Sequence, residues 1–375
     1  MSVYSDILDR YESEGRLRHI PDGDAAAGLL DCSTNDYLGL AARADIADEF
    51  LRLVPERRFT SGASRLLASV QQPYGELEEY LGSLYGKSVL LFNSGYHANT
   101  GAVSALGSAP HTVIVADKLV HASIIDGITL GKAPYVRFRH NDAASLRRLL
   151  EKHDGGSDRM IVVVESIYSM DGDVAPLREI AALKRDFPKM LLYVDEAHAI
   201  GVRGCRGLGV TEELGLEADV DILVGTFGKA CASAGAFVAG SAEIRDFLVN
   251  SARSFIFSTA LPPVNVAFTR FIFEKITSMT AERAHLDSIS AIFRSGVERI
   301  TGQKNVSQSQ IVPLMAGCNA RAVAISSELR RRGVLALPIR RPTVPPGTER
   351  LRFSLNAGMT ETDVDMILTL LKEAI

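Results

Sequence analysis

Lys229 stands in the segment VGTFGKACASAGAF (residues 224–237), among glycines and small residues and directly after an apolar run typical of a buried strand. A lysine in such a turn is usually solvated, with its stem covering apolar surface. Its amine is also a group that forms Schiff bases with carbonyl compounds. Whether Lys229 does chemistry therefore depends on which other side chains the fold brings to it.

Polar side chains come after three further apolar runs. His121 comes after HTVIVAD, Ser169 comes after MIVVVES, and Asp195 and His198 stand in LLYVDEAHAIG. In an open parallel sheet, ligands bind beyond the carboxyl ends of the strands. A lone histidine is more often structural, but several such groups converging on one edge indicate a site.

The segment NSGYHANTG (residues 93–101) comes after the apolar run VLLF and opens a helical pattern. The backbone amides of Ser94, Gly95 and Tyr96 would then lie at a helix N-terminus, where anions bind. An ordinary connection between a strand and a helix explains this stretch equally well when it is taken alone.

The elements that must position these residues belong to an α/β pattern. Short continuous Val/Ile/Leu runs alternate with helical patterns from about residue 72 to residue 265, which predicts a mostly parallel sheet buried on both faces. We expect an N-terminal arm over residues 1–40, a large domain over 41–270 and a smaller α+β domain over 271–375. In the last domain VLALPI is predicted as one strand, and Thr360 and Asp363 as a capping box.

Composition narrows the classes of protein to consider. The chain has 375 residues, a formal net charge of -4 and 46% hydrophobic residues. This balance argues against a protein whose main partner is nucleic acid or an anionic membrane surface. The four cysteines lack the spacing of metal ligands or of a disulfide framework, so we expect no bound metal. The charged N-terminal residues and the short apolar runs lead us to expect no signal peptide or membrane span and a cytoplasmic location.

Two rival classes fit less well. The letters DEAH also occur in nucleic-acid-dependent ATPases, but such a motor needs a phosphate loop, and Leu223 and Ala230 break that pattern around Lys229. The absence of G-x-G-x-x-G after a strand weakens a nicotinamide enzyme. A binding protein without chemistry remains open on fold grounds, yet it leaves Lys229 unexplained.

Pyridoxal phosphate uses all of these groups at once. Lys229 can form the Schiff base, and Asp195 can face the pyridine nitrogen. His198 and Ser169 can hold the phenolic oxygen, and His121 can lie against the ring. Thr226 can share the phosphate with the helix N-terminus at NSGYH.

Short sequence segments along nearly the whole chain resemble those of the α-oxoamine synthase family of fold-type I pyridoxal-phosphate enzymes. The most specific segments are TNDYLGL (34–40), NSGYHANTG (93–101), DKLVHASIIDG (117–127), ESIYSMDGD (165–173), VDEAHAIG (194–201), GTFGKA (225–230), IFSTALPP (256–263) and RPTVPPGTERLRFSL (341–355). The resemblance implies a seven-stranded, mostly parallel sheet in the large domain and a smaller C-terminal α+β domain.

The resemblance also implies roles for named residues. Lys229 would carry the cofactor and move the α-proton of the amino acid. Ser258 would reach the phosphate of the neighbouring subunit's cofactor in a homodimer. Asn35 and Arg352 would approach the substrate carboxylate, and Ser64 would border the substrate amino acid.

Members of this family condense an amino acid with an acyl thioester and, in most cases, release carbon dioxide. RPTVPPGTERLR is most similar to members that use alanine and a pimeloyl thioester for biotin synthesis, and Ser64 favours alanine weakly. Glycine or serine with another acyl thioester stays open, as does an aminotransferase of the same fold type. Ala63, Ser69 and residues 230–234 depart from the family's glycine-rich pattern, so the sequence does not decide which acyl group the enzyme uses.

Overall fold

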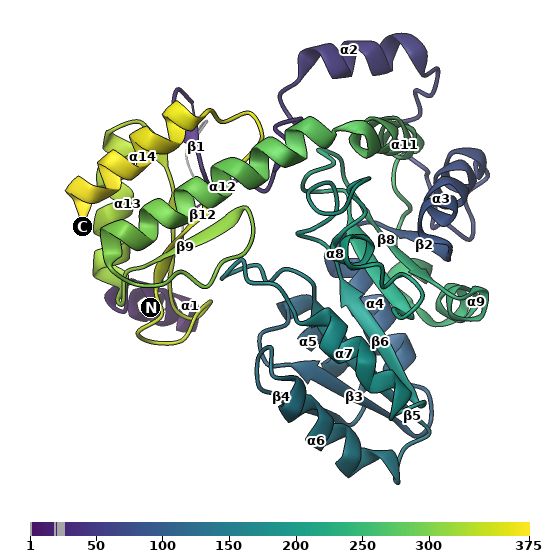
Figure 1. Cartoon of the computed structure of the whole chain (residues 1–375). Coiled ribbons are helices and arrows are strands. Elements are labelled where there is room, and N and C mark those ends of the chain that lie inside the picture. Colours follow the sequence, from purple (N-terminus) through teal and green to yellow (C-terminus); the bar gives the residue numbers. More distant parts are fainter. Residues whose placement is uncertain (1, 19, 21–26) are drawn as a thin grey trace. The chain divides into compact units, whose positions relative to one another are not determined.

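The structure is a computed structural model that describes residues 2–18, 20 and 27–375 (Figure 1). The described residues form two compact units. The larger unit consists of residues 36–169 and 174–284, and the smaller one of the described residues up to 35 together with 170–173 and 285–375. In these described ranges no helix is both long enough and apolar enough to cross a membrane.

The larger unit is built on a seven-stranded sheet with the order β2-β8-β7-β6-β5-β3-β4. Its strands are β2 (Ser88–Phe92), β3 (Thr112–Asp117), β4 (Tyr135–Phe138), β5 (Arg159–Glu165), β6 (Met190–Asp195), β7 (Ile222–Thr226) and β8 (Ala236–Gly240). From β7 to β4 every neighbouring pair is parallel, whereas β8 is antiparallel to both of its neighbours. The prediction of a mostly parallel seven-stranded sheet is confirmed.

Strand direction places the candidate residues on one edge. Because β8 pairs antiparallel with both β2 and β7, β2 runs in the same direction as β7 and the other parallel strands. The carboxyl ends of β2, β3, β5, β6 and β7 therefore lie at the same edge of the sheet. The segments NSGYH, HAS, ESIYS, DEAH and GTFGK all begin at or just after these ends.

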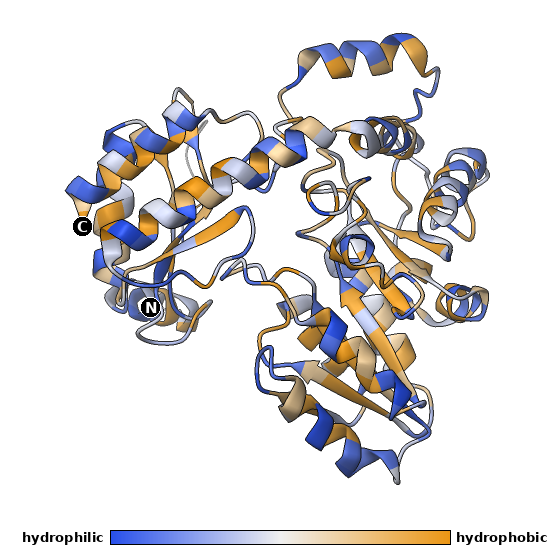
Figure 2. Ribbon diagram, in the orientation of Figure 1, coloured by the Kyte–Doolittle hydropathy of each residue, from blue (hydrophilic) through white to orange (hydrophobic). Residues whose placement is uncertain are grey.

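Both faces of the sheet are buried. Alternate strand residues such as Ile161, Val163 and Tyr193 share one apolar cluster with the helices α4 (Gly95–Gly107), α5 (Ala122–Gly131), α9 (Ala242–Ser251) and α10 (Arg253–Ile256). The intervening residues Val162 and Leu192 point to the other face and are equally buried. Figure 2 shows these strands as continuous hydrophobic ribbons, which explains why the sequence carries uninterrupted apolar runs.

The remaining helices of the larger unit connect and cover the sheet. They are α2 (Ala44–Leu53), α3 (Gln72–Tyr85), α6 (Ala143–Asp154), α7 (Leu177–Ala182), the 3-10 helix η1 (Leu183–Arg185), α8 (Val210–Leu214) and α11 (Pro263–Ser278). α12 (Thr280–Thr301) begins in this unit and continues into the smaller one. The sequence shows a long helical stretch after FSTALPP, and the structure divides it between α11 and α12.

The smaller unit contains a three-stranded antiparallel sheet with the order β11-β12-β9 and a two-stranded parallel pair, β1 with β10. Its elements besides α12 are α1 (Val3–Ser13), β1 (Leu30–Asp31), β9 (Ile311–Met315), α13 (Asn319–Arg331), β10 (Val334–Leu335), β11 (Leu337–Ile339), β12 (Arg350–Ser354) and α14 (Glu361–Ala374). The expected α+β character is confirmed. The Thr360 side chain accepts from the Asp363 amide and the Asp363 side chain accepts from the Thr360 amide, so the expected capping box is present.

Two expectations from the sequence differ from the structure. VLALPI forms two short strands, because Val334 and Leu335 pair with β1 whereas residues 337–339 pair with β12. The edge strand β4 is not apparent in the sequence, because its residues Tyr135 to Arg137 are exposed or half-buried and form no apolar run. Part of the N-terminal arm expected over residues 1–40 (residues 1, 19 and 21–26) lies outside the described residues.

Candidate active site

Lys229 is held beside a buried histidine. Its Nζ lies 2.9 Å from Nε2 of His198, and Nδ1 of His198 lies 2.6 Å from the hydroxyl of Tyr37. His198 and Tyr37 are both buried. The turn that carries the lysine is anchored by Phe227, which is fully buried and whose amide donates to the carbonyl of Gly235. The lysine amine is therefore directed to a defined place and is not a freely solvated charge.

Asp195 ends β6 with both carboxylate oxygens engaged. Oδ1 accepts from the amide of Ala197 at 2.9 Å, and Oδ2 accepts from the side-chain amide of Asn99 at 2.7 Å. The side chain is 5% exposed. A buried carboxylate held by two donors keeps a fixed position, which suits a group that must face one ring atom of a ligand.

Glu165 is the register partner of Asp195 on the neighbouring strand β5. It is almost fully buried, and its Oε1 has no hydrogen-bond partner within the part of the chain that the structure describes. Burial raises the pKa of Glu165 well above its usual value, and the nearby charge of Asp195 raises it further. A neutral carboxylic acid thus lies next to the Asp195 carboxylate.

His121 caps the N-terminus of α5. Its Nδ1 lies 2.8 Å from the hydroxyl of Ser123 and accepts from the amide of Ser123 at 3.2 Å. Desolvation of the charged form lowers the pKa of His121, and the positive charge of Lys229 lowers it further, against the opposing effect of Asp195. A flat, neutral ring with one exposed side is suited to lie against an aromatic ligand.

The start of α4 has groups that could bind an anion. Ser94 is the N-cap residue, and its hydroxyl accepts from the amide of His97 at 3.2 Å. A Cβ placed on Gly95 would lie 3.7 Å from Cβ and Oγ1 of Thr226, so the first turn of α4 faces the end of β7. The Thr226 hydroxyl accepts from the Gly228 amide at 3.3 Å. Amides of a helix N-terminus beside a threonine hydroxyl form a site for a phosphate group.

These groups fit pyridoxal phosphate by their chemistry. The larger unit offers an amine in Lys229, a fixed buried carboxylate in Asp195, a neutral ring in His121 and a phosphate site at Gly95 and Thr226. All of them lie at one edge of one sheet. When bound, the cofactor withdraws electrons from the bonds at the α-carbon of an amino acid attached to it.

Four other residues singled out in the sequence lie in loops or at the first turn of a helix in the larger unit. Ser169 comes after β5 and is half-buried, and Tyr96 is exposed, with its hydroxyl donating to Asp126. Ser64 pairs with Thr259 in an isolated antiparallel bridge, which joins its loop to the segment that contains the half-buried Ser258.

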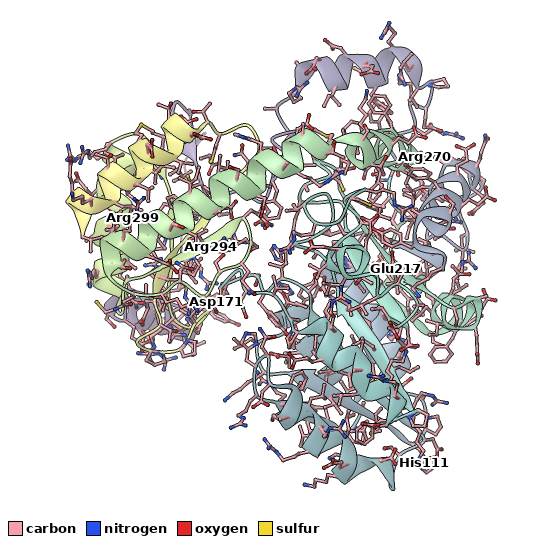
Figure 3. The ribbon with its side chains drawn as sticks, in the orientation of Figure 1. His111, Asp171, Glu217, Arg270, Arg294 and Arg299 are labelled. Carbon is pink, nitrogen blue, oxygen red and sulfur yellow. The ribbon has the colours of Figure 1, made fainter. Side chains whose placement is uncertain are left out.

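In the smaller unit Asn35 and Arg352 come together. Nη2 of Arg352 donates to Oδ1 of Asn35 at 3.0 Å, and Nη1 donates to the Ser354 hydroxyl at 2.7 Å. The same unit contains an ion pair between Arg350 and Asp171, and Figure 3 labels Asp171. The Ser354 hydroxyl and the Asn35 amide oxygen thus help to orient the Arg352 guanidinium.

Three residues of the site are not identified by the sequence reasoning. Asn99 and Tyr37 stand in quoted segments, but their roles depend on contacts between distant elements. Glu196 of DEAH is fully buried, accepts from the amides of Val210 and Thr211, and so holds the loop after β6. Its position directly after Asp195 is the one signal that the sequence carries for it.

Comparison with known proteins agrees with this chemistry. The family model for class I and II aminotransferases matches residues 27–371. The chain is 47% identical to the 8-amino-7-oxononanoate synthase of Haemophilus ducreyi over 388 aligned residues, which cover 99% of this chain and 100% of that protein. Fold and site together thus define a fold-type I, pyridoxal-phosphate-dependent enzyme.

Two solved structures show the same fold. A variant of serine palmitoyltransferase from S. paucimobilis, solved with a bound pyridoxal-phosphate–myriocin aldimine, is 28% identical and superposes with a TM-score of 0.87 over 100% of this chain and 98% of that chain. The 8-amino-7-oxononanoate synthase of Francisella tularensis is 26% identical, with a TM-score of 0.76 over 92% of this chain and 98% of that one. The chain belongs to the class I and II aminotransferase family and, within it, to the α-oxoamine synthases.

Proposed function

We propose that the protein condenses L-alanine with a pimeloyl thioester to give 8-amino-7-oxononanoate, carbon dioxide and free thiol, a step of biotin synthesis. The observation that carries the chemistry is the position of the Lys229 amine beside His198, on the same sheet edge as Asp195. The full-length similarity to 8-amino-7-oxononanoate synthases supports the choice of substrates.

Each residue of the site has a separate role in this proposal. Lys229 holds the cofactor between turnovers and moves the proton at the α-carbon of the amino acid. Asp195 would face the ring nitrogen of the cofactor, His121 would lie against the ring, and His198 with Ser169 would hold the phenolic oxygen. Because His121 is neutral, its ring does not compete with the positive charge that Asp195 stabilises.

The cofactor phosphate and the substrate carboxylate bind to different groups of the protein in this proposal. Ser94, Gly95 and Tyr96 with Thr226 bind the phosphate through the helix N-terminus and the hydroxyl. Arg352, oriented by Asn35, binds the substrate carboxylate through two parallel hydrogen bonds. Ser64 borders the methyl group of alanine.

We further propose that the enzyme works in the cytoplasm as a homodimer in which Ser258 reaches the phosphate bound by the partner subunit. A group of exposed apolar residues supports this assembly. Leu66, Leu67 and Phe257 are 50%, 79% and 70% exposed. They lie on segments joined by the bridge between Ser64 and Thr259. Such a patch is typical of a surface that a partner covers.

Serine with a long-chain acyl thioester is the second candidate, because the superposition with serine palmitoyltransferase extends over the whole chain. An assay of thiol release separates the candidates. The cofactor-loaded protein is given L-alanine, glycine or L-serine, each with pimeloyl, acetyl, succinyl or palmitoyl coenzyme A. We expect the highest kcat/KM for alanine with the pimeloyl thioester. A preference for serine and palmitoyl, or for glycine, would reject the proposed substrates.

A further inference from the structure

Both the NH₂ group and the oxygen of the Asn99 side-chain amide form hydrogen bonds within the larger unit. Its Nδ2 donates to Oδ2 of Asp195 at 2.7 Å and to the Ser123 hydroxyl at 3.0 Å. Its Oδ1 accepts from the Tyr193 hydroxyl at 2.7 Å. Asn99 is 2% exposed, and Ser123 and Tyr193 are fully buried. The amide therefore connects Asp195 on β6 with α5, the helix that begins after His121.

The fold brings these elements together for steric reasons. Tyr193 and Asp195 are two residues apart on β6, so both side chains project from the face that α4 covers. α5 approaches α4 closely because position 127 is glycine. A Cβ there would lie 2.9 Å from Cβ of Val103 and 3.0 Å from the carbonyl oxygen of Asn99. Ser123, one turn earlier on α5, consequently reaches the Asn99 side chain.

The direction of the hydrogen bonds is set by which groups can donate. A carboxylate only accepts, so the NH₂ group of Asn99 faces Asp195 and its oxygen faces Tyr193. The Ser123 hydroxyl accepts from Asn99 and thus donates to Nδ1 of His121, which also accepts from the Ser123 amide. In neutral His121 the proton consequently resides on Nε2.

We propose that Asn99, whose amide orientation is fixed by Tyr193, is a positioning residue that fixes the Asp195 carboxylate and, through the Ser123 hydroxyl, the hydrogen bond to Nδ1 that orients the His121 ring. One buried amide then sets both groups that are assigned to the cofactor ring. The inference rests on the proposed roles of Asp195 and His121, and it does not depend on which amino acid or thioester the enzyme uses.

A double-mutant cycle tests the link to Asp195. Cofactor-free protein is titrated with pyridoxal phosphate, and the dissociation constant is read from the visible absorption for the wild type, Asn99→Ala, Asp195→Asn and the double variant. Loss of a hydrogen bond to a charged group predicts that Asn99→Ala raises the dissociation constant about tenfold or more. Since Asn99 acts through Asp195, the double variant should bind no more weakly than Asp195→Asn alone.

The outcomes separate this inference from the proposed substrates. Independent, additive losses in the double variant would reduce Asn99 to a structural residue and overturn the inference. An unchanged dissociation constant in Asp195→Asn would remove the role of Asp195 and the inference with it. Failure of the substrate proposal would instead appear in the thiol-release assay and leave this cycle unaffected.

Tyr193→Phe provides a variant that keeps the shape of the core. It leaves both donor bonds of Asn99 but frees the amide to rotate, so we expect the dissociation constant to rise about threefold, the effect of a weak neutral hydrogen bond. Tyr85→Phe is the matched control, because the Tyr85 hydroxyl is also buried and donates to the Leu208 carbonyl. Equal effects of the two variants on cofactor binding would contradict the inference.

Ser123→Ala tests the link to His121. We expect the dissociation constant to change less than about twofold, since Asn99 still holds Asp195. In protein labelled with ¹⁵N-histidine, the Nδ1 signal of His121 should shift because the Ser123 hydroxyl no longer donates to it, while the backbone amide of residue 123 still donates to Nδ1 and keeps the proton on Nε2. The signals are assigned by their loss in His121→Ala. An unchanged Nδ1 signal in Ser123→Ala would show that the Ser123 hydroxyl does not connect Asn99 to His121.

Discussion

Glu165 and Asp195 are register partners at the carboxyl ends of the neighbouring parallel strands β5 and β6, and both are nearly fully buried. Register partners in a parallel sheet project from the same face. Two carboxyl groups on one buried surface cannot both carry a full charge without large cost. Burial raises the pKa of Glu165 well above its usual value and the charge of Asp195 raises it further, so that Glu165 is protonated beside the site.

This raised pKa predicts how stability depends on pH. A glutamate whose pKa is higher in the folded state stabilises fully only below its unfolded pKa, and the contribution is lost as pH rises toward the folded pKa. In Glu165→Gln this side chain no longer binds a proton on folding. The free energy of unfolding of the variant should therefore fall less steeply as pH rises, with a slope smaller than that of the wild type by up to about 1.4 kcal/mol per pH unit. Urea unfolding from pH 5 to pH 8 measures the slope.

Glu151→Gln serves as the control for that slope, because Glu151 is exposed on α6. Its stability curve should run parallel to that of the wild type. If the Glu165→Gln curve also ran parallel, Glu165 would not be protonated in the folded protein at these pH values.

Tyr37→Phe should weaken the support of His198. The Tyr37 hydroxyl lies 2.6 Å from Nδ1 of His198, whose other nitrogen lies beside the Lys229 amine. Removing one partner of a buried polar group costs about 1–3 kcal/mol of stability, and we expect kcat to fall by about tenfold because the ring reorients. Steady-state kinetics over a range of pH measures the loss and its pH dependence.

Tyr74→Phe is the comparison for Tyr37→Phe. The Tyr74 hydroxyl is also buried and donates to the carbonyl of Leu261. This variant should lose stability while keeping kcat. A loss of kcat of the same size in both variants would mean that Tyr37 acts only on the stability of the fold.

Lys229→Ala should abolish turnover while leaving the fold intact, because the side chain is half-buried and makes no contribution to the apolar core. Borohydride reduction of the cofactor-loaded wild type should add the mass of a phosphopyridoxyl group to the peptide that contains Lys229. The exposed Lys118 provides the control substitution, and Lys118→Ala should retain both properties. Turnover of Lys229→Ala near the wild-type rate would reject its assignment.

Leu67→Glu should weaken the proposed homodimer. The leucine is 79% exposed in the single chain, and burying a new charge at an interface is costly. Sedimentation should show dissociation at micromolar concentration, with loss of activity if Ser258 serves the partner's site. Leu130 is 68% exposed on α5 and outside the patch, so Leu130→Glu should leave the assembly unchanged. A Leu67→Glu protein that stayed dimeric would place the interface elsewhere.

The sequence predicts the framework of the site because parallel strands leave a strong local signal. Each of the runs before Ser94, His121, Asp195 and Lys229 is continuously apolar, and parallel strands buried on both faces must place the residues after their carboxyl ends at one edge. Turn chemistry and the capping box at Thr360 are likewise local properties.

The parts that could not be predicted depend on contacts between elements distant in sequence. The pairing of Glu165 with Asp195 requires β5 and β6 to be neighbours in register. The connection from Asn99 to Ser123 requires the close approach of α4 and α5 at Gly127. Tyr37 reaches His198 from a segment 161 residues away. No periodicity in the sequence encodes these distances.

We propose that this protein joins the amino acid to the acyl group with loss of the amino acid's carboxylate. The most direct test gives the cofactor-loaded enzyme L-alanine labelled with ¹³C in its carboxyl group, together with pimeloyl coenzyme A, and monitors the products by mass spectrometry. If the proposed condensation takes place, we expect unlabelled 8-amino-7-oxononanoate, ¹³C-labelled carbon dioxide and one free thiol per turnover. Labelled pyruvate without carbon dioxide or thiol release would show amino transfer instead and would contradict the proposal.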